Sequence, residues 1–181
     1  MALAQPTQFL ILTGASGSGK TTIADRVEAC ADGRIHVLRF DSVGVPSPEE
    51  MTVQYGSGEG WQRAMTHQWI KRIQTLLPEG KPVLLEGQMK IAFINEALAK
   101  HDVENAQCWL VDCSDAERAR RLTGERNQPE LATSHMMGWA RYLRQEAADQ
   151  CAHRLDTDSL SCEEAVDRIL RHFGLGGAKP Q

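Results

Sequence analysis

The sequence predicts an α/β fold in which helices cover both faces of a parallel sheet. Helix and strand signals alternate along the whole chain of 181 residues, which is the order expected when helices connect parallel strands. The strand signals are short apolar runs, as in a sheet buried on both faces. Because one well-buried core suits a chain of this length, we expect residues 1–181 to form a single domain.

Each element follows from a local pattern. Five strands are expected, at residues 9–13, 35–40, 83–86 and 107–112 and in a short run near 154–156. A first helix follows at 21–31, and three apolar stripes at helical spacing predict helices around 61–76, 136–147 and 165–173. Pro78 and Gly80 end the second helix. We interpret the methionines and tryptophans of these stripes as core residues rather than cofactor contacts.

Three segments lack this periodicity. Residues 42–60, rich in proline and glycine, predict a loop or a short broken helix beside a binding site. Residues 123–130 are polar and follow a cluster of arginines. The tail from Gly174 to Gln181 predicts a frayed terminus.

The composition excludes several classes of protein. A hydrophobic content of 41% and a charged content of 24% are ordinary for a soluble globular chain, and a net charge of −4 argues against a non-specific nucleic-acid binder. No apolar run is long enough to span a membrane, and Met1–Pro6 lacks the features of a signal peptide, so we expect a cytoplasmic protein. The five cysteines form no C-x-x-C pair, and we expect them to be small buried residues.

One motif carries most of the functional information. The eight residues between the first strand and the first helix match G-x-x-x-x-G-K-[ST]: Gly14, Ala15, Ser16, Gly17, Ser18, Gly19, Lys20 and Thr21. In this context the glycines let backbone N–H groups wrap a polyphosphate at a helix N-terminus. Lys20 would neutralise the β- and γ-phosphates, and the hydroxyl of Thr21 would bind Mg²⁺. With Thr22 beside them, these residues predict a nucleoside triphosphate site, and a chance glycine-rich turn is the weaker interpretation.

Three acidic residues fall at the carboxyl ends of expected strands, where open parallel sheets bind ligands. Asp41 could accept the proton of a substrate hydroxyl or hold Mg²⁺ through water, and Glu86 could order the water shell of the metal or the nucleophile. The structural alternative for both is a helix cap or loop anchor. For Asp112 we favour the structural role, with Ser114 as the N-cap of the next helix.

Four arginines cluster after the fourth strand: Arg118, Arg120, Arg121 and Arg126. Phosphate contact and a solvated helix face are equally good interpretations of this cluster.

Over residues 8–173 the chain resembles the P-loop small-molecule kinases, which include gluconate, shikimate, uridine and nucleoside monophosphate kinases. The resemblance rests on residues 14–21, Asp41, the pair Glu86–Gly87 and the arginine-bearing segment 118–130. It implies a three-layer P-loop sandwich whose five strands have the order 2-3-1-4-5, with a lid at about residues 124–131. It also implies that Arg126 and Arg121 close on the ATP phosphates and that the loop around Thr157 lies near the adenine. No N-K-x-D guanine-reading segment occurs, so ATP is expected rather than GTP.

These features predict a Mg²⁺-dependent phosphotransferase that moves the γ-phosphoryl group of ATP to a hydroxyl of a small molecule, acting as a monomer or homodimer without nucleic acid or membrane. An ATP-binding switch or partner-binding module is the alternative, because it needs the same nucleotide site. The acceptor is open, as is the choice of Asp41 or Glu86 as the base. Candidate acceptor contacts are Ser42, Glu59, Arg63, His67, Gln88 and Lys90, although a plain surface histidine is the better interpretation of His67.

Overall fold

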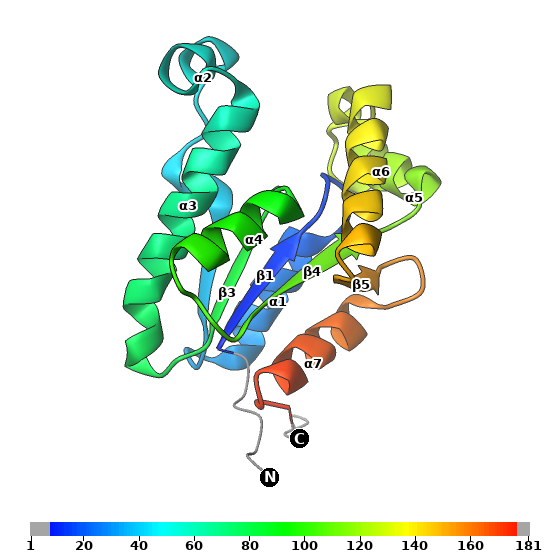
Figure 1. Cartoon of the computed structure of the whole chain (residues 1–181). Coiled ribbons are helices and arrows are strands. Elements are labelled where there is room, and N and C mark those ends of the chain that lie inside the picture. Colours follow the sequence, from blue (N-terminus) through cyan, green and yellow to red (C-terminus); the bar gives the residue numbers. More distant parts are fainter. Residues whose placement is uncertain (1–7, 177–181) are drawn as a thin grey trace.

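A computed structural model describes residues 8–176 and contains one five-stranded sheet in which every neighbouring pair is parallel. The strand order is β2-β3-β1-β4-β5, as expected (Figure 1). The strands are β1 (Phe9–Thr13), β2 (His36–Arg39), β3 (Val83–Gly87), β4 (Ala106–Asp112) and β5 (His153–Asp156). Their ends agree with the sequence prediction to within one residue. The expectations for Met1–Pro6 and for most of the tail lie outside the described residues.

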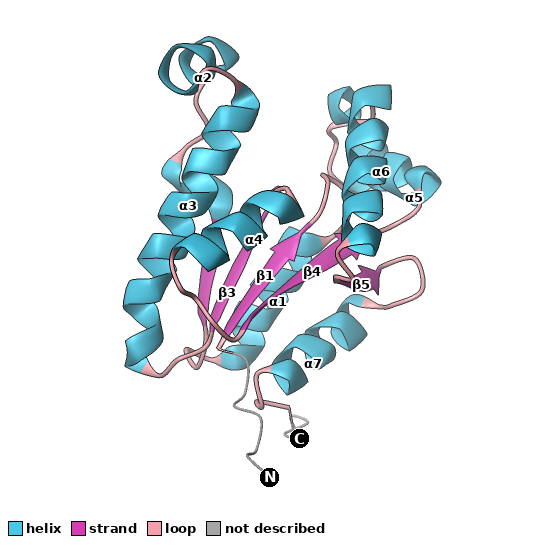
Figure 2. Cartoon of the chain, in the orientation of Figure 1, coloured by secondary structure: helices cyan, strands magenta, loops and turns pink. Residues whose placement is uncertain are grey.

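Helices cover both faces of this sheet (Figure 2). They are α1 (Lys20–Ala31), α2 (Pro48–Tyr55), α3 (Gly58–Leu76), α4 (Ile91–Lys100), α5 (Asp115–Arg120), α6 (Ser134–Asp149) and α7 (Cys162–His172). None of the helices in the described part of the chain combines the length and the apolar character needed to cross a membrane. The fold class is therefore the predicted three-layer α/β arrangement.

The two core layers follow from the alternation of side chains along β1. Leu10 and Leu12 point to one face, where they pack with residues of α1 and α7 such as Val27 and Ile169. The neighbouring residues Phe9 and Ile11 point to the other face, where the aromatic and apolar stripe of α3 covers them. Each such side chain contributes about 1.5–3 kcal/mol of burial, so the central strand is held from both sides.

The segment 42–60 is mostly helical. Ser47 and Glu50 form a capping box at the start of α2, with Pro48 in the first turn, and Gly56 ends the helix in the left-handed conformation at φ 79°. A Cβ on Gly60 would lie 2.2 Å from the Tyr55 carbonyl oxygen, so glycine allows the close turn from α2 into α3. In Figure 1, α2 stands beyond the carboxyl ends of the strands; none of its residues is fully buried, although Met51 and Tyr55 pack against the core beside α3.

The connection from α5 to α6 contains a π-helical turn (Arg121–Glu125) and a 3₁₀ turn (Pro129–Leu131). It lies at the same end of the sheet as α2, at the opposite side (Figure 1). One expectation about the cysteines is wrong, because Cys30 and Cys151 are exposed, whereas Cys113 is buried. Cys30 lies in the last turn of α1 and Cys151 in the turn after α6, both at surface positions.

Candidate active site

The phosphate loop, residues Gly14–Thr21, joins β1 to α1 and needs its glycines for two different reasons. Gly17 and Gly19 adopt positive φ angles of 79° and 95°, which only glycine takes readily. A Cβ on Gly14 would lie 2.3 Å from the Val111 carbonyl oxygen of β4, so the loop packs tightly against the sheet. No side chain caps the N-terminus of α1, and its first turn has no acidic residue. The positive helix end is therefore left for an anion.

Lys20 is a buried cation without a partner in the described residues. The residue is 7% exposed, and none of the hydrogen bonds or ion pairs within residues 8–176 involves its ammonium group. Burial lowers the pKa of Lys20, while the nearby carboxylates of Glu86 and Asp41 act to raise it. A buried ammonium in this position is stabilised when an anionic ligand pairs with it, as a triphosphate would.

Thr21 and Glu86 meet across the edge of the loop. The Thr21 hydroxyl donates to Glu86 Oε2 at 3.3 Å, and the Glu86 side chain at the end of β3 is buried. Burial raises the pKa of Glu86, an effect that Lys20 and the Thr21 hydrogen bond partly offset. No group of three or more His, Cys, Asp or Glu side chains among the described residues could hold a metal alone. Two oxygen donors beside a phosphate site fit Mg²⁺, which usually takes its other ligands from phosphates and water.

A first cavity of about 450 Å³ opens along the phosphate loop. Eight of the predicted site residues line it: Gly17, Gly19, Lys20, Thr21, Thr22, Arg121, Arg126 and Thr157. The four remaining loop residues, Gly14, Ala15, Ser16 and Ser18, are buried within the loop itself, and Asp41 and Glu86 are not among the residues that line this cavity. The structure thus brings together the phosphate loop and three of the four clustered arginines, Arg120, Arg121 and Arg126, around one space.

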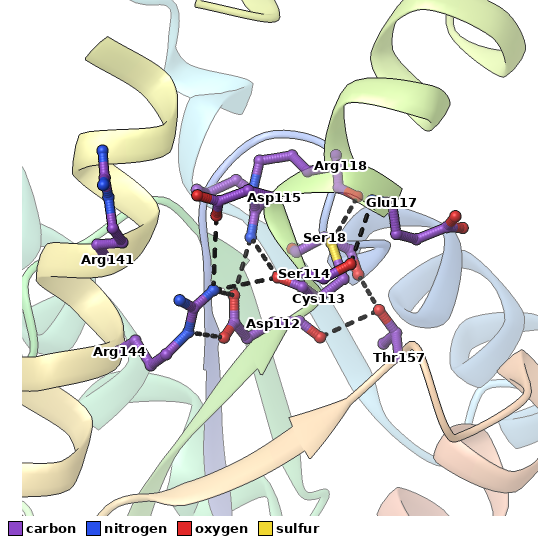
Figure 3. Close-up of polar contacts among 12 residues, drawn as sticks. Ser18, Asp112, Cys113, Ser114, Asp115, Glu117, Arg118, Arg141, Arg144 and Thr157 are labelled. Carbon is purple, nitrogen blue, oxygen red and sulfur yellow. Dashed lines mark hydrogen bonds and ion pairs between the residues drawn. The ribbon is translucent and has the colours of Figure 1, made fainter. Parts of the chain in front are cut away.

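Arg118 fits neither interpretation of the arginine cluster, phosphate contact or a solvated helix face. It is fully buried beneath the phosphate loop (Figure 3). Its guanidinium donates to Asp112 Oδ1 at 2.8 Å and to the Ser16 carbonyl oxygen at 2.8 Å. Arg144 of α6 donates to Asp112 Oδ2 at 2.6 Å from the other side. Asp112 therefore anchors the loop, as its structural interpretation predicted, and Ser114 caps α5 as expected.

The other arginines differ in their contacts. Arg121 donates to Glu117, to the carbonyl oxygens of Gly17 and Ser18, and to Thr157. Thr157 in turn donates from its hydroxyl to the Ser18 carbonyl oxygen at 2.9 Å. Both residues line the first cavity while their polar atoms hold the loop.

Arg120 pairs with two glutamates at the surface. Arg126 is exposed and pairs with no described residue, and it is close enough to Lys20 to lower the pKa of that lysine.

Asp41 lies in a 3₁₀ turn (Phe40–Val43) directly after β2. A Cβ on Gly87 would lie 2.3 Å from Phe40 Cβ, so glycine at the end of β3 lets this turn approach closely. The Asp41 side chain is exposed, makes no hydrogen bond with a described residue, and acts electrostatically on both Lys20 and Glu86. It therefore lies on the phosphate-loop side of the sheet with its carboxylate uncommitted.

A second cavity of about 480 Å³ lies between α3 and α6. It is lined mainly by Glu59 and Gln62 of α3, Gln88 and Lys90 after β3, and Trp139 and Tyr142 of α6. Gln88 connects it to the phosphate loop, because its Nε2 donates to Ser16 Oγ at 3.0 Å and its Oε1 accepts from Trp139 Nε1 at 3.1 Å. The two cavities therefore flank the same loop.

The predicted acceptor contacts divide between this cavity and other surfaces. Glu59, Gln88 and Lys90 line it, while Ser42 is exposed in the turn after β2. Arg63 and His67 both bind Glu96 of α4 instead. His67 is also largely buried, at 17% exposed, which corrects its interpretation as a surface residue. Sequence reasoning missed Gln62, Trp139 and Tyr142, since nothing in helical spacing shows which side of a helix borders a cavity.

No protein-family model and no curated protein sequence matches the chain, but solved structures match its fold. A sugar kinase from Janibacter sp. HTCC2649 superposes with a TM-score of 0.64 at 17% identity, covering 96% of this chain and 100% of that one. A shikimate kinase from Acinetobacter baumannii in complex with shikimate gives 0.59 at 17% identity and 91% of each chain. A gluconokinase from Sinorhizobium meliloti 1021 gives 0.56 at 13% identity, covering 94% and 93%. The chain therefore has the fold of the P-loop small-molecule kinases.

Proposed function

We propose that this protein is an ATP-dependent kinase that transfers the γ-phosphoryl group to a hydroxyl of a small molecule. The observation that carries the proposal is the second cavity, which adjoins the phosphate loop through the Gln88–Ser16 hydrogen bond. A nucleotide switch needs the first cavity alone, whereas a kinase also needs space for an acceptor beside the phosphates. The names of the structural neighbours support the same class of reaction.

Catalysis would consist of positioning and charge neutralisation. In this proposal the loop N–H groups and Lys20 bind the β- and γ-phosphates in the first cavity. Thr21 and, through water, Glu86 would hold Mg²⁺, which neutralises phosphate charge when bound. Asp41 is the preferred base, because its carboxylate is uncommitted while Glu86 is bonded to Thr21.

The segment 124–131 would act as a lid that excludes water from the reaction. Arg126 is its exposed, unpaired cation in the described structure, so a closing movement would add a positive charge beside the transferred group. Arg121 would support the loop rather than move, since its donors already bind Glu117, loop carbonyl oxygens and Thr157. We propose that residues 1–181 act together as one such domain.

The test is ATP consumption coupled to acceptor phosphorylation. Wild-type protein with Mg²⁺ and ATP is screened against neutral sugars, sugar acids, nucleosides and aromatic alcohols, and the phosphorylated product is identified by mass spectrometry. Lys20→Met should abolish product formation and weaken ATP binding while the protein stays folded, whereas Lys100→Met at the exposed end of α4 should behave as wild type. Acceptor-independent hydrolysis, with no phosphorylated product from any class, would favour the switch.

A further inference from the structure

Resting on this proposed function, we infer that the acceptor is an uncharged, hydroxyl-bearing ring rather than a carboxylic acid. The inference comes from the second cavity, whose lysine is already neutralised and whose α6 wall is aromatic.

The first argument concerns charge. Lys90 is the only lysine or arginine among the described residues that line the second cavity, and its ammonium lies 2.9 Å from Glu59 Oε2. An acceptor carboxylate would have to displace Glu59, whose side chain is 60% exposed, from Lys90 or pair with the exposed His135, whereas a neutral hydroxyl leaves the Lys90–Glu59 pair intact. Arg63 is nearby on α3 but cannot substitute, since its guanidinium binds Glu96 at 2.9 and 3.1 Å. The cavity therefore discriminates against acids.

The second argument concerns the aromatic wall. The rings of Trp139 and Tyr142 are nearly parallel, at 9°, with their centroids 5.4 Å apart. Trp139 Nε1 donates to Gln88, and the Tyr142 hydroxyl donates to the buried carboxylate of Glu146 at 3.1 Å. The polar atoms of both rings are bound within the protein, and the Lys90 ammonium lies over the Tyr142 ring at 5.1 Å, so the apolar ring surface left for a ligand belongs chiefly to Trp139. Such a preformed surface suits the apolar face of a ring.

The third argument concerns the polar groups. Gln62 accepts from the Lys90 backbone N–H and donates to the Gln88 carbonyl oxygen, so the two glutamines are held in fixed positions. Neutral amides both donate and accept, which matches hydroxyl groups rather than a carboxylate, an acceptor only when ionised. Gln88 also touches Ser16 of the phosphate loop, so a hydroxyl bound near it would lie on the side facing the phosphates.

The test uses matched pairs of compounds that differ chiefly in a carboxylate: glucose and glucuronate, methyl shikimate and shikimate, uridine and orotidine. Binding in the presence of Mg²⁺ and a non-hydrolysable ATP analogue is measured by calorimetry, and phosphoryl transfer is measured with ATP. We expect at least one neutral member to bind and react with kcat/KM tenfold or more above its acid.

Preference for an acid would overturn the inference and leave the kinase proposal standing. Binding of neutral members without transfer would support the inference and contradict the kinase proposal. If no neutral member binds, the inference is wrong.

Two variants test whether the preference for neutral acceptors comes from the second cavity. Glu59→Gln frees Lys90, so turnover of the acid in the best pair should rise several-fold relative to its neutral partner, whereas Glu49→Gln on exposed α2 should change neither. Trp139→Leu should raise the KM of the neutral acceptor about tenfold with the KM of ATP unchanged, and Trp139→Phe, which keeps a ring face, should restore most of it. An unchanged preference in Glu59→Gln would contradict the charge argument.

Discussion

Arg118 and Asp112 form a buried ion pair under the phosphate loop, with 2.8 Å between Arg118 Nη2 and Asp112 Oδ1. The same guanidinium donates to the Ser16 carbonyl oxygen, so the pair joins the end of β4 to the loop that would hold the phosphates. Arg144 and Arg154 also contact Asp112, at the partly exposed side of the cluster. The conformation of the phosphate loop thus depends on an arginine that no phosphate could reach.

Arg118→Met should destabilise the protein by about 3 kcal/mol, because it leaves loop carbonyl oxygens and one side of a buried carboxylate without a donor. Urea denaturation followed by circular dichroism measures the change. Arg171→Met is the matched control, since its pair with Asp167 on α7 is exposed, and the loss should stay within ~0.5 kcal/mol. Equal losses in the two variants would show that the buried pair does not anchor the loop.

The same cluster shows how far sequence reasoning reaches. The strands, their order and the phosphate loop follow from short-range signals, namely apolar runs and a motif whose glycines serve the backbone. Arg118 and Arg126 look alike in the sequence, yet one is fully buried and the other exposed. Only the packing of α5 against the loop separates them, and that packing joins residues about a hundred positions apart.

The second cavity illustrates the same limit. The stripe of α3 was predicted as core, and Trp61, Met65 and Trp69 are indeed buried there. Trp139 of α6 instead reaches a cavity through its bond to Gln88. Because its neighbours in the cavity come from α3 and from the end of β3, no pattern within α6 could have identified this role.

Glu86 should impose a pH dependence on turnover. Its pKa is raised by burial above the ordinary 4.5, so the carboxylate that would order the metal's water shell is lost as the pH falls through this raised value. Glu86→Gln should lower kcat by about 10- to 100-fold at neutral pH and remove this acidic limb. A kcat–pH profile of both proteins tests it, and an acidic limb kept in the variant would assign it to another group.

The raised pKa of Glu86 also determines how the stability of the protein changes with pH. A carboxyl with a raised pKa in the fold binds more protons there than in the unfolded chain, so the free energy of unfolding falls as the pH rises from 4.5 through the raised value. Relative to wild type, Glu86→Gln should gain stability across this window, as measured by thermal melts at several pH values.

The segment 124–131 should exchange its amide hydrogens rapidly in the free protein. Its residues are mostly exposed, and the backbone hydrogen bonds of Arg126, Asn127, Gln128 and Leu131 all end on carbonyl oxygens of the same short connection, within 121–128, so they can open without disturbing the sheet. Mg²⁺ with a non-hydrolysable ATP analogue should slow this exchange about tenfold or more as the lid closes, while exchange in α7 changes little. Equal exchange with and without the nucleotide analogue would argue against a lid.

Asp41 separates a kinase from a nucleotide switch. Asp41→Asn keeps the size of the side chain but removes the charge and the base that would accept the acceptor proton. In a kinase, ATP affinity should stay within a few-fold while kcat falls by about 10²-fold or more. Glu49→Gln, which changes an exposed carboxylate on α2, is the control and should retain full turnover.

The Asp41 carboxylate acts electrostatically on both Lys20 and Glu86 without a hydrogen bond of its own. A loss of kcat with an unchanged melting temperature would therefore indicate a chemical role. If Asp41→Asn retains turnover, Glu86 becomes the candidate for the base. If basal hydrolysis is unchanged and no acceptor product forms, the result favours a switch.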